Sequence, residues 1–266
     1  MKRIAIALLF SLLLATLVYQ PGNRSAVQAQ SISVTSTNDL PTLDQVLEKY
    51  VQALGGKAAF EKLTSRVTVQ ATMRPEGMAK MEIYEKAPNK RLVVFTLEDR
   101  SKVQSGFDGQ VAWSKYRYSP VEEIKGAELA YLREDSEFHR EIKLKELFPQ
   151  MMLKGKATLE GRSTYFVEAP STGGRIEKMY FDTRSGLLVR RVQQAAFWVR
   201  PSETEPGRSE LLDIVYDYSD YREVDGVKLP FHMRRRMPAG EITFTEVNEV
   251  KHNVAVDDAK FKPPAS

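Results

Sequence analysis

Residue types that commonly perform chemistry are few in this chain of 266 residues and stand far apart. The three histidines are His139, His232 and His252, and the chain contains no cysteine. Metal sites of the His-Glu-x-x-His and cysteine-cluster types need their ligands at close, regular spacing. Attachment of a c-type haem needs Cys-x-x-Cys-His. The sequence therefore predicts neither a metal site nor a cofactor.

Nucleophilic and general acid–base catalysis also lack a signature in this sequence. The Gly-x-Ser-x-Gly turn that presents a serine nucleophile does not occur. Glu122-Glu123 and Asp257-Asp258 are adjacent acids, and adjacent side chains diverge on both helices and strands. A glycosidase-like carboxylate pair is therefore not indicated. A hydrolase whose Ser, His and acid residues meet only in the folded chain is the least supported interpretation.

Glycine-containing and basic stretches give weak indications of phosphate or nucleic-acid binding. Gly173-Gly174 follow a predicted strand but precede no predicted helix, so we expect turn glycines there. Arg234, Arg235 and Arg236 form a basic run, and neighbours on a strand point to opposite faces. We expect these arginines, like the pair at 190 and 191, to be solvated or to form ion pairs.

The N-terminal residues have the pattern of a secretory signal peptide. Lys2 and Arg3 precede an apolar run over residues 4–19, and small or polar residues follow. Val27 and Ala29 suit the third and first positions before a cut, which predicts a leader of residues 1–29 cleaved after Ala29. The alternative is a retained anchor, but the run is short for a span of roughly 20 residues. We predict a periplasmic or secreted protein with no stable membrane span after cleavage.

Cleavage changes the charge balance of the chain. The leader region holds three of the 39 basic residues and none of the 35 acidic residues, so the two charges almost cancel in the mature chain. A nearly neutral chain has no electrostatic footprint for nucleic acid. Nucleic acid is therefore excluded as an expected partner.

Two short helices are predicted at the start of the folded part. Residues 30–40 are polar and unpatterned, which predicts a linker. From Pro41 to Leu54 apolar residues recur at helical spacing, and Gly55 suits the left-handed position after a helix. A second helix is predicted over residues 57–63. Because the hairpin has one apolar face, it has to pack on another element.

Most of the remaining chain has the two-residue alternation of β-strands. Ile214, Tyr216 and Tyr218 share one face of a long predicted strand, and the polar residues between them share the other. The strands are joined by tight turns, which connect antiparallel neighbours. We predict a mainly β (α+β) fold of about eleven antiparallel strands, curled into an incomplete barrel with helices plugging or lidding its apolar concave face. Residues 122–152 are predicted to be helical, and the tail from residue 257 irregular.

Five segments occur in an order that resembles one known group of proteins. They are YVQALGGKAAFEKLTS, MEIYEKAPNKRLVV, GFDGQVAW, EKMYFDTRSGLLVRR and DYREVDGVKLPF. The order resembles a secreted branch related to the bacterial outer-membrane lipoprotein-sorting proteins, the LolA/LolB-like superfamily. The resemblance covers residues 41–264, which we expect to form a single half-barrel domain. It implies an open antiparallel barrel with a helical lid.

The resemblance also implies a class of function. The best-known members of the superfamily carry the acyl chains of lipoproteins across the periplasm, and a similar module is fused behind multihaem cytochrome-type segments. The functional arginine of the carriers and the protruding loop of the outer-membrane receptor have no match in this sequence. Specific lipoprotein sorting is thus less well indicated than the binding of an apolar ligand.

Large apolar residues near the predicted barrel mouth and lid are the candidate ligand-binding residues. Ordinary core packing is the alternative for each of them. The loop that follows Trp198 is polar and long, as expected of a barrel mouth or a partner contact. The candidates are Phe95, Trp113, Phe138, Leu147, Phe148, Met151, Met152, Phe197 and Trp198.

The leading functional hypothesis is a non-enzymatic periplasmic binding or carrier protein. It would hold an acyl chain, a lipoprotein or another apolar ligand in the half-barrel, without covalent chemistry. The alternative is an interaction or scaffold module of the cell envelope that takes no ligand and serves a protein partner, for example a redox complex. An exposed apolar patch outside the barrel would favour that alternative.

Overall fold

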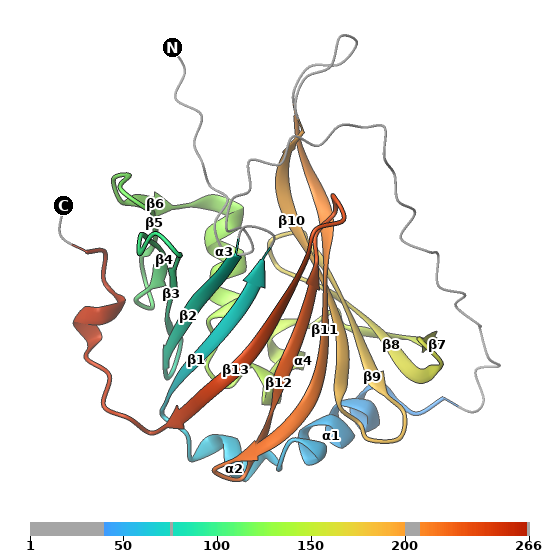
Figure 1. The fold of residues 1–266 in the computed structure, drawn as a ribbon. Coiled ribbons are helices and arrows are strands. Elements are labelled where there is room, and N and C mark those ends of the chain that lie inside the picture. Colours follow the sequence, from blue (N-terminus) through green and yellow to red (C-terminus); the bar gives the residue numbers. More distant parts are fainter. Residues whose placement is uncertain (1–39, 75–76, 200–207, 265–266) are drawn as a thin grey trace.

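The computed structural model describes residues 40–74, 77–199 and 208–264 (Figure 1). The predicted leader, and the predicted linker up to residue 39, lie outside the described residues. Within the described part, one antiparallel sheet of thirteen strands makes up most of the structure. The strands are β1 (Ser65–Arg74), β2 (Gly77–Lys86), β3 (Lys90–Thr96), β4 (Lys102–Phe107), β5 (Ala112–Tyr116), β6 (Glu122–Ile124), β7 (Met152–Leu159), β8 (Arg162–Pro170), β9 (Ile176–Asp182), β10 (Leu188–Val199), β11 (Arg208–Val224), β12 (Val227–Arg236) and β13 (Ile242–His252).

The first and the last strand of the sheet pair with each other in its middle. β1 and β13 are antiparallel neighbours, with Val67 opposite Lys251 and Met73 opposite Phe244. The order of the sheet is therefore β6-β5-β4-β3-β2-β1-β13-β12-β11-β10-β9-β8-β7. Its two edges, β6 and β7, follow each other in the sequence. The segment between them has to cross the open side of the curved sheet.

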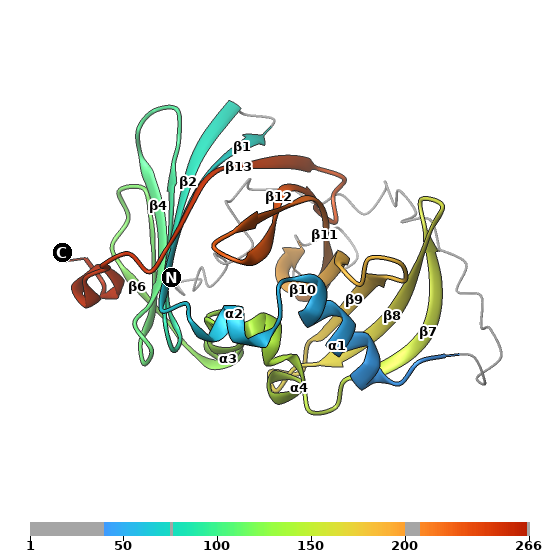
Figure 2. The same cartoon turned by 90° about the horizontal axis from the view of Figure 1, so that it is seen from below.

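All the helical elements but the last lie along that open side. Figure 2 shows the sheet as an arch, with these helices across its opening and the last one, near the C-terminus, on the outer side of the sheet. The predicted open half-barrel with helices over its concave side is therefore confirmed, with thirteen strands in the described part instead of about eleven. The helices are α1 (Leu43–Ala53), α2 (Lys57–Glu61), α3 (Gly126–Asp135), the 3-10 turn η2 (Arg140–Ile142), α4 (Leu144–Leu147) and the 3-10 turn η3 (Asp258–Phe261).

A capping box fixes the start of the N-terminal helix α1, and its apolar stripe packs against the sheet. The Thr42 side chain accepts a hydrogen bond from the Gln45 amide, and the Gln45 side chain accepts one from the Thr42 amide. This capping box satisfies two amide groups at the helix start. Val46 and Tyr50 on the apolar stripe are buried. The Tyr50 ring meets the edge of Phe181 on β9, with 5.0 Å between the ring centres.

Packing under α1 forms the largest core of the described residues. It joins the two N-terminal helices to β8, β9 and the helical segment before β7. Each large side chain buried there contributes about 1.5–3 kcal/mol to folding. The fully buried members include Leu54, Phe60, Phe148, Val167, Met179 and Phe181.

Gly55 lets the helical hairpin dock onto the β11–β12 turn. Its φ is +116°, and a Cβ at this position would lie 2.1 Å from the carbonyl oxygen of Gly226. The amide of Lys228 also donates to the Leu54 carbonyl at 2.8 Å. The hinge between the two helices is thus fixed against the sheet.

We expect Gly55→Ala to lower the free energy of unfolding by about 2 kcal/mol or more, because left-handed strain and a backbone clash add together. Gly161→Ala is the matched control, since Gly161 has φ +79° and a Cβ at that position would meet no neighbouring atom within 4 Å. Urea unfolding of both variants measures the difference. Equal losses in the two variants would mean that the close approach to Gly226 does not constrain the hinge.

Two predicted local structures are wrong. Residues 122–124 form the edge strand β6 instead of a helix, because Ala112 and Ser114 of β5 pair with them. The C-terminal tail is ordered by packing: Phe261 in η3 is fully buried on the convex side of the sheet. The indole Nε1 of Trp113 donates to the Phe261 carbonyl at 2.7 Å. The proline-containing tail thus completes a second, smaller core.

Candidate functional site

The concave face of the sheet encloses a cavity of about 330 Å³. A smaller cavity of about 130 Å³ continues from it toward α1. The combined space is at the lower end of the range for small-molecule sites. Five residues line both cavities: Glu141, Arg191, Tyr218, Leu229 and Pro230.

One wall of the cavity is apolar. Met81 on β2, Phe95 on β3 and Val103 on β4 lie opposite one another in a row across these three strands. Ile83 and Val93 form the next row toward the helices. All five side chains line the cavity.

The central strand β1 is polar on its concave face. Every second residue, from Arg66 through Gln70 to Arg74, lines the cavity, whereas the apolar residues between them lie on the convex face. Thr72 on β1 and Thr245 on β13 are buried, and their hydroxyls lie 3.0 Å apart. The prediction of an apolar concave face is therefore wrong for this part of the sheet.

Four strands on the other side of the cavity place polar side chains in one row. Arg191 lies opposite Tyr216, Tyr216 opposite Arg235, and Arg235 opposite Thr243. All four line the cavity. The neighbours Arg190 and Arg234 point to the convex face, where both bind Asp217. The predicted alternation and ion pairing of the two basic runs are confirmed.

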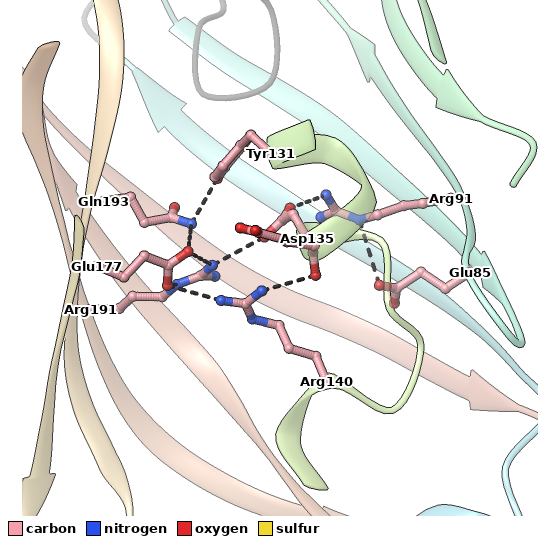
Figure 3. Close-up of polar contacts among 9 residues, drawn as sticks. Glu85, Arg91, Tyr131, Asp135, Arg140, Glu177, Arg191 and Gln193 are labelled. Carbon is pink, nitrogen blue, oxygen red and sulfur yellow. Dashed lines mark hydrogen bonds and ion pairs between the residues drawn. The ribbon is translucent and has the colours of Figure 1, made fainter. Parts of the chain in front are cut away.

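A buried network of charges ties the helical segment to both walls (Figure 3). Asp135, at the end of α3, accepts from Arg91 of β3 at 2.7 Å and from Arg191 of β10 at 3.3 Å. Glu177 of β9 accepts from Arg191 at 2.7 Å and from Arg140 of η2 at 2.9 Å. Asp135 thus bridges two strands that belong to opposite walls of the half-barrel.

Gln193 and Tyr131 complete the network at the α3 side. The Gln193 amide group lies 2.7 Å from the Tyr131 hydroxyl. With the amide oxygen turned toward Arg191, Gln193 accepts from both the guanidinium and the phenol. Such fully partnered polar groups fix one arrangement of helix and sheet.

The carboxylates of this network stay ionised. Burial alone would raise the pKa of Asp135, but the guanidinium groups of Arg91, Arg191 and Arg140 lower it to about 2. Burial also opposes ionisation of Glu177, and Arg140 and Arg191 more than compensate, so its pKa is lowered. Because both acids stay ionised and partnered, neither serves as a general acid near neutral pH.

The sequence-predicted ligand residues do not gather around one cavity. Phe95 lines the main cavity. Trp113 is buried in the convex-side core beside Phe261. Phe197 lies on β10 and packs against a separate cluster that contains Ile214. Trp198 is on the same strand, but its side chain and residues 200–207, predicted to form a polar loop, lie outside the described residues.

The remaining predicted residues belong to the core under α1 or to the surface. Phe138, Phe148 and Met151 are buried in that core, and Leu147 packs against it. Met152 begins strand β7 and is 49% exposed. The arginines and polar residues of the cavity were not predicted. The signal for them was the alternation of polar residues from 66 to 74.

The histidines are dispersed over the described part of the structure. His139 contacts the Leu63 carbonyl, His232 contacts Glu246 and His252 contacts Asp225. Within residues 40–74, 77–199 and 208–264, no group of three or more His, Cys, Asp or Glu side chains is arranged to hold a metal ion. In the same residues, no helix has the length and hydrophobicity to cross a membrane.

Comparisons with known proteins place the fold among LolA-like open barrels. A LolA superfamily protein from Nitrosomonas europaea is 11% identical, with 84% of this chain and 99% of that chain covered and a TM-score of 0.53. A putative outer membrane lipoprotein-sorting protein domain from Vibrio parahaemolyticus is 11% identical, with 82% and 96% covered and a TM-score of 0.55. A DUF1329 family protein from Desulfovibrio piger is 15% identical, with 84% and 98% covered and a TM-score of 0.54.

These similarities establish the LolA-like fold that the resemblance of the sequence implied. No family model matches the sequence, and no curated protein matches it. The function therefore has to be argued from the cavity itself.

Proposed function

We propose that this protein binds a lipid-like ligand reversibly in the concave cavity and carries it without covalent chemistry. The observation that supports this most directly is the apolar wall of Met81, Phe95 and Val103 beside a polar row, inside an open half-barrel. Burial of a chain against such a wall contributes about 25 cal/mol per Å² of apolar area. The ligand class is an acyl chain, a lipoprotein or another molecule with an apolar segment.

The proposed setting is the periplasm. Cleavage after Ala29 would release the chain from residue 30 onward, in which residues 41–264 form one half-barrel domain that can move between membranes. Phe95 remains the sequence-predicted ligand contact with the best structural support, because it lines the cavity. For Trp113, Phe138 and Phe148, packing within the cores supports a structural role better than ligand contact.

Phe95→Gln tests the proposed site, with Phe244→Gln as the matched control. Phe244 is 51% exposed on β13 and does not line the concave cavity. We expect Phe95→Gln to weaken binding of a monooleoyl lipid about tenfold, because an aromatic contact is replaced by a polar one. Phe244→Gln should bind like the wild type. Calorimetric titration of both variants measures these affinities. Equal lipid affinities of the two variants would contradict the concave cavity as the binding site.

A second candidate function is a docking module for another protein of the cell envelope. Met78, Met73 and Phe244 are cross-strand neighbours, and each is about half exposed outside the barrel. An exposed apolar row of this kind is typical of protein contacts. The same titration separates the two candidates, because a module without a ligand would take up no lipid in either variant.

A further inference from the structure

The apolar wall of the concave cavity continues into a buried amide side chain. Gln70 on β1 lies opposite Met81 on β2 and, on its other side, opposite Val247 on β13. From Met81 the same row leads through Phe95 to Val103. All five side chains line the concave cavity. Gln70 is therefore the one polar side chain in a row of five that crosses neighbouring strands.

The Gln70 side chain has no partner in the described part of the chain. Gln70 is 5% exposed, and its amide makes no hydrogen bond to another described residue. The hydroxyl of Thr72, two residues further along β1, lies 3.0 Å from that of Thr245 and bonds with it instead. Buried polar side chains nearly always have a hydrogen-bond partner. A buried amide that lines a cavity without one points to a partner on a ligand.

The chemistry of Gln70 favours a neutral partner. A glutamine amide carries no charge and offers two N–H donors and a carbonyl acceptor. Two of the arginines that line the cavity are engaged by acids: Arg66 by Glu85 and Arg91 by Asp135, both at 2.7 Å. The two neighbours of Gln70 in the row are apolar. A neutral group with one acceptor and one donor is complementary to this amide.

We propose that Gln70 recognises an acyl amide, that is, a carbonyl and an N–H at the head of a hydrocarbon chain. The amide nitrogen of Gln70 donates to the carbonyl oxygen of the ligand, and the carbonyl oxygen of Gln70 accepts from the N–H of the ligand. The hydrocarbon chain lies along Met81, Phe95 and Val103. This inference rests on the proposed function, since it names the ligand class of the same cavity.

Two lipids that differ in one group test this preference. The probes are N-methyl oleamide and methyl oleate, which have the same chain and differ only in an N–H in place of an ester oxygen. Both are titrated calorimetrically into the protein below their aggregation concentrations. We expect the amide to bind about tenfold tighter, because the ester cannot donate and leaves the Gln70 carbonyl oxygen without a partner.

Gln70→Leu locates the preference, and Gln110→Leu is the matched control. Gln110 is exposed in the turn between β4 and β5 and does not line the concave cavity. Gln70→Leu should lower the affinity for N-methyl oleamide about tenfold and leave the affinity for methyl oleate unchanged. Gln110→Leu should keep the preference of the wild type.

The stability of Gln70→Leu provides a second measurement. Leucine has a similar size and replaces an amide that has no partner among the described residues, so urea unfolding should show no loss of stability. A marked loss of stability with unchanged lipid affinities would assign the Gln70 amide to the core and overturn its role in binding.

The outcomes separate the amide inference from the proposed function. Equal affinity of the wild type for the two lipids would overturn the acyl-amide preference and leave the lipid-binding function standing. Binding of neither lipid would overturn both. Equal effects of Gln70→Leu and Gln110→Leu on the affinity for N-methyl oleamide would overturn Gln70 as the contact.

Discussion

Replacing Asp135 with alanine is expected to lower the free energy of unfolding by about 3 kcal/mol. Without this carboxylate, the positive charges of its buried arginine partners are less well neutralised. The Asp135 side chain is 14% exposed and contacts Arg91 and Arg191. These arginines lie on strands from opposite walls, so the variant also loses the link between α3 and both walls. Urea unfolding at pH 7 measures the effect.

Asp213→Ala is the matched control for this variant. Asp213 pairs with Lys178 at 2.9 Å, and the two side chains are 40% and 32% exposed. Surface pairs of this kind contribute about 0–1 kcal/mol. If both variants lost the same small amount of stability, the buried network would not hold the helical segment to the sheet.

The network also predicts how stability depends on pH. The pKa of Asp135 is lowered from 3.8 to about 2 in the folded chain, against burial, by the arginines around it. An acid whose pKa is lower in the folded chain than in the unfolded chain stabilises the fold fully when the pH is above the unfolded pKa. This contribution is lost as the pH falls through the folded pKa. We expect the wild type to lose stability between about pH 5 and 2, and Asp135→Ala to lose less over that window. Parallel curves for the two proteins would contradict this assignment.

Trp113→Ala is expected to lower the free energy of unfolding by about 3–5 kcal/mol, as do other truncations of large buried aromatic residues. Trp113 is 2% exposed, and its indole hydrogen bond holds the C-terminal turn at Phe261. Gly106 packs beneath the ring, where a Cβ would lie 2.4 Å from an indole carbon. Thermal and urea unfolding measure the loss.

The Trp113→Ala variant also tests whether Trp113 is a core residue and not a ligand contact. Trp113 packs on the convex side of the sheet with Leu92 and Val94, away from the residues that line the cavity. Lipid affinity of the folded Trp113→Ala protein should therefore match that of the wild type. A stable variant with reduced lipid affinity would place the ligand next to Trp113 instead of Phe95.

The sequence was sufficient to predict the antiparallel strands joined by tight turns and the N-terminal helical hairpin. Alternation, turn residues and helical spacing are local signals, and the glycine at position 55 is local too. The short strand at 122–124 was not predicted, because it exists only through pairing with β5. The buried tail was missed for the same reason, since Phe261 is ordered by a contact with Trp113, which is 148 residues away.

The candidate site was harder to predict than the fold. Alternation assigns residues 66 to 74 to two faces, but it does not say which face is concave. The assumption that apolar residues fill the concave side holds for Met81, Phe95 and Val103 and fails for β1. The row from Arg191 to Thr243 depends on the register of four strands, which no single segment encodes.

Native mass spectrometry of the protein, purified from cells without detergent, tests the central claim most directly. The account predicts a discrete extra mass that organic solvent removes and that analysis of the extract identifies as a lipid-like molecule. Phe95→Gln should carry less of this mass, and Phe244→Gln as much as the wild type. A bare protein mass that stays unchanged after addition of oleate or N-methyl oleamide would contradict the account.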